Sequence, residues 1–300
     1  MRILLAIDGS ACSDRATELV STFALPPESV VRVIAVQQPF LDILGMSWGT
    51  IGDSASNTEL EEERDARVLH DAIERAEIAL RRPGLRLEGF LVRGRPASAI
   101  VDEAGAMEAD LVVMGSRGHG TIATMVLGST ASEVVYHAPC PVLVARRNEL
   151  GTVAFADDGS RSARTAEAVI AAWPLFADRE ISVVTVAETA VPVAAGFTPG
   201  MYDQALDAYS RSVDDAREEV ALESRTAAHR LVDAGFNATP VVLEGDAATE
   251  IMRYAASRGT GTIVMGTRGH TGLARLLMGS VARNVLLHAS CSVLIVRAGH

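Results

Sequence analysis

The chain has 300 residues, a formal net charge of -11 and 48% hydrophobic residues. This length predicts about two domains, each large enough to bury its own core. The negative charge argues against broad electrostatic binding to nucleic acid or to anionic membranes. All 27 positively charged residues are Arg, and the lack of Lys excludes a Walker-type G-x4-G-K-[ST] loop, a kinase-style phosphate lysine and Schiff-base chemistry.

The cysteines and the start of the chain bear on its compartment. Cys12, Cys140 and Cys291 form no C-x-x-C pair, which fits small buried hydrophobes in a reducing cytosol better than a disulfide framework. Met1 and Arg2 run directly into the strand-like stretch at 3–7, without the pattern of a cleaved leader. No apolar run approaches the ~18 residues that a membrane helix needs. We therefore expect a cytoplasmic protein.

Short apolar runs alternate with helical stretches in the first half. In chain order we expect a strand at 3–7, a helix at 11–23, a strand at 30–36, a helix at 59–82, a strand at 85–92, a helix at 97–106, a strand at 110–114, a helix at 129–137 and a strand at 142–145. Residues 37–58, with several Gly, Ser and Thr, form a long loop. Residues 146–151 form a short linker.

The second half repeats this order. We expect a strand at 152–156, a helix ending at 173, a strand at 181–186, a loop at 187–201, a helix at 202–234, a strand at 239–243, a helix at 247–257, a strand at 262–265, a helix at 281–288 and a strand at 292–296. Asp8 aligns with Asp158 at an offset of 150, whereas Cys140 aligns with Cys291 at an offset of 151, so one residue has been inserted between. The repeat predicts two domains, residues 1–147 and 148–300.

Alternating strands and helices with short connections predict an α/β fold. We expect two tandem Rossmann-like domains, each a five-stranded parallel sheet with strand order 3-2-1-4-5 and helices on both faces. Ligands in such sheets bind beyond the carboxyl ends of the strands, where the strand order reverses. Asp8 and Gly115 would face each other at that crevice in the first half, and Asp158 and Gly266 in the second.

A glycine motif, G-x2-G-x9-G-[ST], occurs once in each half. The first copy is Met114-Gly115-Ser116-Arg117-Gly118 followed after nine residues by Gly128-Ser129-Thr130, and the second is Met265-Gly266-Thr267-Arg268-Gly269 followed after nine residues by Gly279-Ser280-Val281. Glycines let backbone N–H groups approach an anion, and a helix N-terminus adds further donors. A hydroxyl at Ser129 or Ser280 can cap the helix or donate to a phosphate. A glycine-rich turn is the alternative, but two matching copies favour phosphate binding.

These motifs carry a family resemblance. The first half has Ala6-Ile7-Asp8-Gly9-Ser10, its glycine motif and His137-Ala138-Pro139-Cys140-Pro141-Val142-Leu143-Val144. The second half has Asp158-Gly159-Ser160, its glycine motif and His288-Ala289-Ser290-Cys291-Ser292-Val293-Leu294. Each half resembles a universal stress protein domain, of the adenine nucleotide alpha hydrolase-like fold. The whole chain resembles the tandem form of the ATP-binding branch.

The resemblance implies ATP in each crevice, with Mg²⁺ as a compatible companion of the phosphates. Asp8 and Asp158 would contact the nucleoside, Val36 and Val186 the adenine, and the glycine motifs the ribose and phosphates. Both Asp-to-Val spacings are 28 residues. An Asx cap on the following helix is the alternative role of the two aspartates, and it is compatible with ligand contact.

The second half departs from the family pattern at two places. Asp157 replaces Ile7 and adds an acid near the nucleotide, while serines replace the prolines that flank Cys140. The loop histidines His119 and His270 could touch a γ-phosphate or be solvated, and we assign them no catalytic role.

Two further histidines and the spacing of ligand-type residues point to structure rather than metal binding. His137 and His288 end helices, where the helix dipole favours them. No cluster has convincing spacing for a metal cage made of protein ligands alone.

Three functions compete. The first is a cytoplasmic stress-response binding module whose ATP occupancy sets its conformation or partner choice. The second is a weak ATPase or nucleotidyl-transfer enzyme, which the lack of Lys disfavours. The third is an interaction scaffold with empty pockets.

The terminal strand of each half is an apolar sheet edge that needs a partner. The family resemblance implies that such edges pair with one another, so we expect an intrachain pseudo-dimer, which leaves other surfaces for a homodimer.

Overall fold

The computed structural model describes residues 1–39, 55–118, 127–187, 217–267 and 278–297. Strands and helices alternate along these residues, and every strand and helix predicted within them is present. The two long loops, expected at 37–58 and 187–201, fall mostly outside the described residues.

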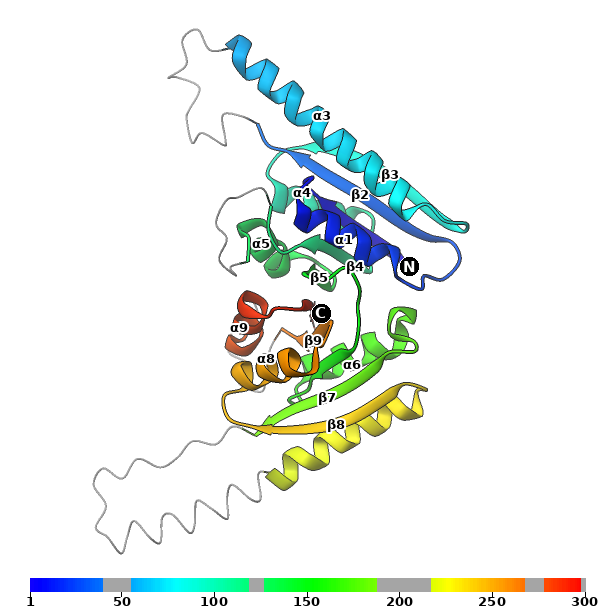
Figure 1. The fold of residues 1–300 in the computed structure, drawn as a ribbon, viewed down its shortest axis with the longest axis vertical. Helices are drawn as coiled ribbons and strands as arrows, with labels where there is room; N and C mark the ends of the chain where they lie inside the picture. The colour runs from blue at the N-terminus through cyan, green and yellow to red at the C-terminus, as the bar shows by residue number, and fades with distance from the viewer. Residues whose placement is uncertain (40–54, 119–126, 188–216, 268–277, 298–300) are drawn as a thin grey trace, which may run out of the picture.

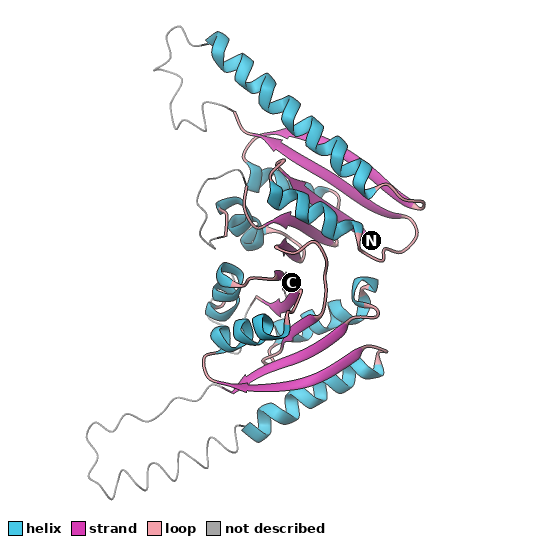
Figure 2. Ribbon diagram, in the orientation of Figure 1, coloured by secondary structure: helices cyan, strands magenta, loops and turns pink. Residues whose placement is uncertain are grey.

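The described strands form one ten-stranded sheet that runs along the molecule (Figure 2). They are β1 (Arg2–Ile7), β2 (Ser29–Gln37), β3 (Leu85–Arg93), β4 (Leu111–Gly115), β5 (Val142–Ala145), β6 (Val153–Ala156), β7 (Glu180–Ala187), β8 (Asn237–Glu244), β9 (Thr262–Gly266) and β10 (Ser292–Val296). Their order is β3-β2-β1-β4-β5-β10-β9-β6-β7-β8, and all neighbours within a half are parallel. Each half therefore has the predicted order 3-2-1-4-5, and the predicted fold class is confirmed.

Helices cover both faces of the sheet (Figure 1). One face carries α1 (Ala11–Ser21), α3 (Ala55–Leu80), α6 (Arg161–Ala172) with the 3-10 turn η1 (Pro174–Phe176), and a helix over residues 217–233. The opposite face carries α4 (Pro96–Ala106), α5 (Ser129–His137), α8 (Ala247–Arg258) and α9 (Ser280–His288). None of the helices described has the length and apolarity that crossing a membrane requires.

The central strands explain why the sheet has two apolar cores. Leu5 and Val113 face the α1 side, whereas Leu4 and Val112 face the α4 side. Every residue of β4, β5 and β6 is buried, because helices cover both faces of these strands. Such strands are continuous apolar runs. The end strands β3 and β8 are partly exposed.

Helix α3 differs from the prediction at both ends. It begins at Ala55 and ends at Leu80, whereas the expected range was 59–82. The acidic run that starts at Glu59 therefore lies one turn inside the helix, and Arg81 and Arg82 follow its last residue.

The two halves meet where β5 pairs with β10 in antiparallel orientation. The register joins Val142 to Ile295, Leu143 to Leu294 and Val144 to Val293. Leu143 and Leu294 are equivalent residues of the two halves, separated by the repeat offset of 151. An approximate two-fold axis therefore passes between them. The predicted intrachain pairing of the terminal strands is confirmed.

Two arginines reinforce this seam in a reciprocal way. Arg146 follows β5 and donates to the backbone oxygens of Leu286, in the last turn of α9, and of Cys291 at 3.4 Å. Its counterpart Arg297 follows β10 and donates to the backbone oxygen of Tyr136, in the last turn of α5. A cation near the C-terminus of a helix is favoured by the helix dipole. Each half thus caps a helix of the other.

We predict that residues 1–147, expressed alone, form a homodimer. Their β5 edge would lose β10, and Leu143 could pair with its own copy as it now pairs with Leu294. An uncovered apolar edge strand is a template for association. Light scattering on the purified half checks this expectation.

Residues 148–300 are the matched control and should dimerise around Leu294. An equimolar mixture of the two halves should form a heterodimer that restores the β5–β10 pair. A half that stays monomeric, with β5 amides protected from hydrogen exchange, would show that the edge needs no partner.

Candidate functional site

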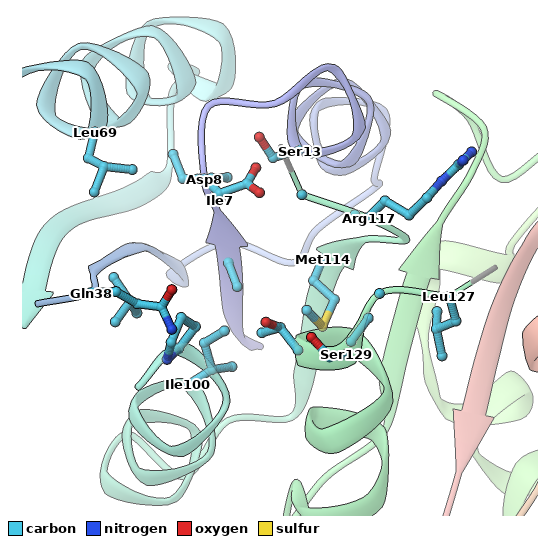
Figure 3. A pocket seen from close by; sticks show the side chains of 18 of the residues that line it. Ile7, Asp8, Ser13, Gln38, Leu69, Ile100, Met114, Arg117, Leu127 and Ser129 are labelled. Carbon is cyan, nitrogen blue, oxygen red and sulfur yellow. The ribbon is translucent and has the colours of Figure 1, made fainter. Parts of the chain in front are cut away.

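A cavity of about 730 Å³ lies at the carboxyl ends of β1, β2 and β4 (Figure 3). Residues from these strands, from the loops after β1 and β4, and from helices α1, α3, α4 and α5 line it. The strand order reverses between β1 and β4, and this is where ligands bind in such sheets. The cavity therefore lies where the sequence predicted a crevice.

Nine residues that the sequence assigned to the first site line this cavity. They are Asp8, Val36, Met114, Gly115, Arg117, Gly118, Gly128, Ser129 and Thr130. Parallel pairing of β1 with β4 sets Ala6 beside Met114, and pairing with β2 sets Ala6 beside Ile34. Three strands thus end together and bring their following residues to one crevice.

Asp8 shapes the turn between β1 and α1. Its Oδ1 accepts a hydrogen bond from the Ser10 N–H at 3.0 Å, which is an Asx turn. Ser10, not Asp8, is the N-cap of α1, since its hydroxyl oxygen accepts from the Ser13 N–H at 3.3 Å. Asp158 and Ser160 repeat this arrangement before α6. Asp8 and Asp158 are therefore not the helix caps themselves.

The first two glycines of the first motif make close contacts. A Cβ on Gly115 would lie 2.7 Å from the backbone carbonyl carbon of Cys12, so only glycine lets β4 end against α1. A Cβ on Gly118 would overlap Oδ2 of Asp8. The sequence suggested open phosphate space beside Gly118, but the carboxylate of Asp8 lies there. A larger residue at position 118 would therefore affect the site by displacing the Asp8 carboxylate.

The start of α5 presents its backbone to the cavity. Gly128 is the N-cap and has no side chain to satisfy the first N–H groups. Its own N–H donates to the Ser116 oxygen at 2.8 Å, which closes the loop. Ser129 is the first helical residue, so the expectation that Ser129 or Ser280 caps its helix was wrong. Uncapped N–H groups at a helix start favour an anion.

Side chains on the cavity wall include several that the sequence did not single out. Ser13, Gln38, Asp65, Leu69 and Ile100 line it. The sequence predicted the long helix but did not indicate which turn meets the crevice. Figure 3 also shows the Arg117 side chain extending away from Asp8 and Ser129.

The second half places its predicted residues in equivalent elements. Asp158 follows β6, Val186 lies in β7, Met265 and Gly266 end β9, Gly279 is the N-cap of α9, and Ser280 and Val281 begin that helix. A Cβ on Gly266 would lie 2.7 Å from the Cβ of Ser162, the counterpart of Cys12. The Gly279 N–H donates to the Thr267 oxygen at 2.8 Å, as Gly128 donates to Ser116. Arg268 and Gly269 lie outside the described residues.

The remaining titratable candidates are structural where they are described. The three cysteines are free and buried, as predicted, and burial raises the pKa of the Cys140 thiol to about 11. His137 and His288 end α5 and α9. His119 and His270 fall outside the described residues. Within those residues, no group of three or more His, Cys, Asp or Glu is placed to hold a metal ion.

Asp157 is a chemical difference between the halves that lies beside the predicted site. It replaces Ile7 and is only 3% exposed. Its Oδ1 accepts from the Gly159 N–H at 3.0 Å, whereas its Oδ2 has no hydrogen-bond partner in the part of the chain that is described. Burial raises the pKa of Asp157 from 3.8 to about 6, and the nearby carboxylates of Glu223 and Glu167 add to this rise. A buried carboxylate without a cationic partner is costly.

Two doubly wound halves, joined edge to edge and each with its strand order reversing at a switch point, define a tandem α/β protein. A profile of the universal stress protein family matches residues 1–146 and again residues 150–297. The chain belongs to the universal stress protein family.

Known relatives match either one half or the whole chain. A universal stress protein of Thermus aquaticus is 35% identical over 48% of this chain and 97% of its own length. A universal stress protein of Mycobacterium tuberculosis is 26% identical over 98% of this chain and 96% of its own length. The crystal structure of a universal stress protein from Archaeoglobus fulgidus has a TM-score of 0.66 and 19% identity, and it covers 99% of this chain and 98% of that one. The tandem arrangement thus has full-length counterparts.

We predict that Asp157→Asn stabilises the unliganded protein at neutral pH. The pKa of Asp157 is higher in the folded chain, so its favourable effect is complete below about pH 3.8 and is lost as pH rises through about 6. A rise from 3.8 to about 6 corresponds to about 3 kcal/mol. Urea unfolding across this pH range should show the gain above about pH 6 and none near pH 4. If the free energy of unfolding of the variant differed from that of the wild type by the same amount at all pH values, the raised pKa of Asp157 would be contradicted.

Proposed function

We propose that the chain binds ATP in each of its two crevices and acts as a cytoplasmic stress-response module. In this proposal nucleotide occupancy sets the conformation of the chain or its choice of protein partner. The main support is that nine residues, assigned to nucleotide contact from the sequence, line one cavity of about 730 Å³. Such a volume is within the range of small-molecule sites.

The chemistry of the first crevice suits the parts of a nucleotide. Val36, Leu69 and Ile100 offer apolar contact for a base, and the Asp8 carboxylate can accept from ribose hydroxyls. The uncapped start of α5 and the glycine loop supply N–H donors for phosphates. The base, the sugar and the phosphates would thus each contact a different part of the cavity wall.

We propose binding with slow or no turnover. Phosphoryl transfer requires cations that neutralise the developing charge and a group that positions the attacking water. Arg117 is the basic residue among the described lining residues, and its side chain extends away from Asp8 (Figure 3). Mg²⁺ would enter with the phosphates and be held by them and by water.

The proposed setting is a reducing compartment. The three cysteines are buried as free thiols, and burial raises the pKa of Cys140 and of Cys291. Such thiols are inert structural residues. Together with the acidic composition, this fits a cytoplasmic regulator that binds a nucleotide and a protein, and neither nucleic acid nor membrane.

We expect two nucleotides per chain, because both halves carry the acid after the first strand and both carry a glycine motif. Nucleotide extracted from the purified protein and identified by mass would show which base and phosphate chain are bound. Calorimetric titration of the emptied protein gives the number of sites. A value near one would mean that one half has lost binding, and a value of zero would favour an empty scaffold.

Gly118→Val should remove binding from the first half alone and lower the stoichiometry from two to one. A Cβ at this position displaces the Asp8 carboxylate, while the exposed position of Gly118 spares the core. Gly105→Ala in α4 is the matched control, since a Cβ there meets nothing within 4 Å. If folded Gly118→Val protein still bound two nucleotides with full affinity, the glycine loop would have no role in binding.

A further inference from the structure

The residues beneath the helix that follows the second strand differ between the two halves. In the first half, Ile7 in β1 pairs with Ala35 in β2, and both are buried in the apolar core. Ile7 also lines the cavity, beside Asp8 and Leu69 (Figure 3). The first crevice therefore has an apolar wall on this side.

The same two positions are polar in the second half. At the offset of 150, Asp157 replaces Ile7 and Thr185 replaces Ala35. The Asp157 N–H donates to the Val184 oxygen at 2.9 Å, which extends the β6–β7 pairing by one residue and sets Asp157 beside Thr185. Each of the two side chains is 3% exposed. Neighbouring residues on parallel strands point to the same face of the sheet.

Both side chains have an oxygen without a partner. Asp157 Oδ2 and Thr185 Oγ1 form no hydrogen bond with any described residue. Buried polar atoms are almost always paired, so each unpaired atom needs an explanation. Asp157 and Thr185, which carry these atoms and are neighbours near the carboxyl ends of β6 and β7, form a small polar subsite that the first half lacks.

The surrounding charges do not supply the missing partner. On the helices that cover Asp157, Arg230 donates to Glu167 at 2.5 and 2.6 Å, and Arg164 lies 3.7 Å from Glu223. Both arginines are thus engaged with other carboxylates. Glu223 and Glu167 raise the pKa of Asp157, and Arg164 lowers it. Within the described ranges, the positive charges near Asp157 pair elsewhere.

The hydroxyl of Ser224 already has a hydrogen-bond partner. Ser224, on the helix over residues 217–233, is fully buried, and its hydroxyl donates to the Val183 oxygen at 3.2 Å. It therefore directs its proton to β7 rather than to Asp157. The carboxylate oxygen Oδ2 of Asp157 remains an open acceptor, and the Thr185 hydroxyl can either donate or accept.

We propose that Asp157, supported by Thr185, is a specificity-determining residue of the second crevice and accepts a hydrogen bond from an N–H or O–H group of the bound nucleoside. This inference rests on the proposed nucleotide binding and concerns the second half alone. Exocyclic amino groups of bases and ribose hydroxyls share the required chemistry, because each donates to a carboxylate. The apolar side chain of Ile7, which lines the first crevice, cannot accept such a bond. The two crevices would then select different nucleosides.

The raised pKa of Asp157 adds a second consequence. An ionised carboxylate accepts a stronger hydrogen bond than a protonated one. Protonation of Asp157 near pH 6 should therefore weaken the second site and leave the first site unchanged. The first site serves as the internal control for protonation of the nucleotide itself, since both sites meet the same ligand.

The test is a calorimetric titration of the full chain with ATP at about pH 8, where Asp157 is ionised. In Asp157→Ile, which installs the first-half residue, one of two binding events should weaken by roughly tenfold to hundredfold. Asp157→Asn, which keeps the shape, should weaken the same event. Thr185→Ala, which also copies the first half, should have a smaller effect on that event. Two unchanged events in both Asp157 variants would overturn the inference.

Two analogues identify the donor. Purine riboside triphosphate lacks the amino group of ATP, and 2′,3′-dideoxy-ATP lacks the ribose hydroxyls. Weakening of the second event relative to the first by either analogue supports the inference and names the donor. Equal binding of both analogues and ATP at the second site would overturn it. Wild-type protein with no binding event would instead refute the proposed function, so the two failures are distinct.

Discussion

The antiparallel pair of β5 with β10 is the contact on which the architecture depends. Each half would otherwise end in an apolar strand with unpaired backbone groups. Pairing around Leu143 and Leu294 closes both edges at once and turns two five-stranded sheets into one. Arg146 and Arg297 cross the same seam and hold the C-terminal ends of α9 and α5. Since α5 and α9 begin at the glycine loops, the seam also fixes the far ends of the helices that shape the crevices.

The two halves share a backbone plan but not a chemistry. The turns of Asp8 and Asp158, the serine caps of α1 and α6, and the N–H bonds of Gly128 and Gly279 are repeated almost bond for bond. The wall beside them is not repeated. A carboxylate occupies the place of an isoleucine, although its burial costs stability. Buried groups with strongly perturbed pKa values are concentrated at functional sites. Binding to the second half should therefore be measured separately from binding to the first.

Much of the fold followed from the sequence because continuous apolar runs and glycine turns recur in two copies. The start of α3 did not, because Ala55, Ser56, Asn57 and Thr58 carry no apolar periodicity. Ser129 resembled a cap in sequence, but backbone geometry gives that place to Gly128. The exchange of Ile7 for Asp157 was visible in sequence, whereas the unpaired Oδ2 required the packing of neighbouring helices. The assignment of individual residues to nucleotide contact remains a prediction.

Covalent joining of the halves has a genetic consequence. If the same sheet were built from two identical one-domain chains, every substitution would appear in both crevices. A buried acid beside one site would then accompany a buried acid beside the other, and the cost in stability would double. Here the linker between β5 and β6 joins the two halves in one chain, so each half is encoded by its own part of the gene. One half can keep Ile7 while the other carries Asp157. Duplication within one chain thus lets the two sites diverge while the two halves still share one sheet.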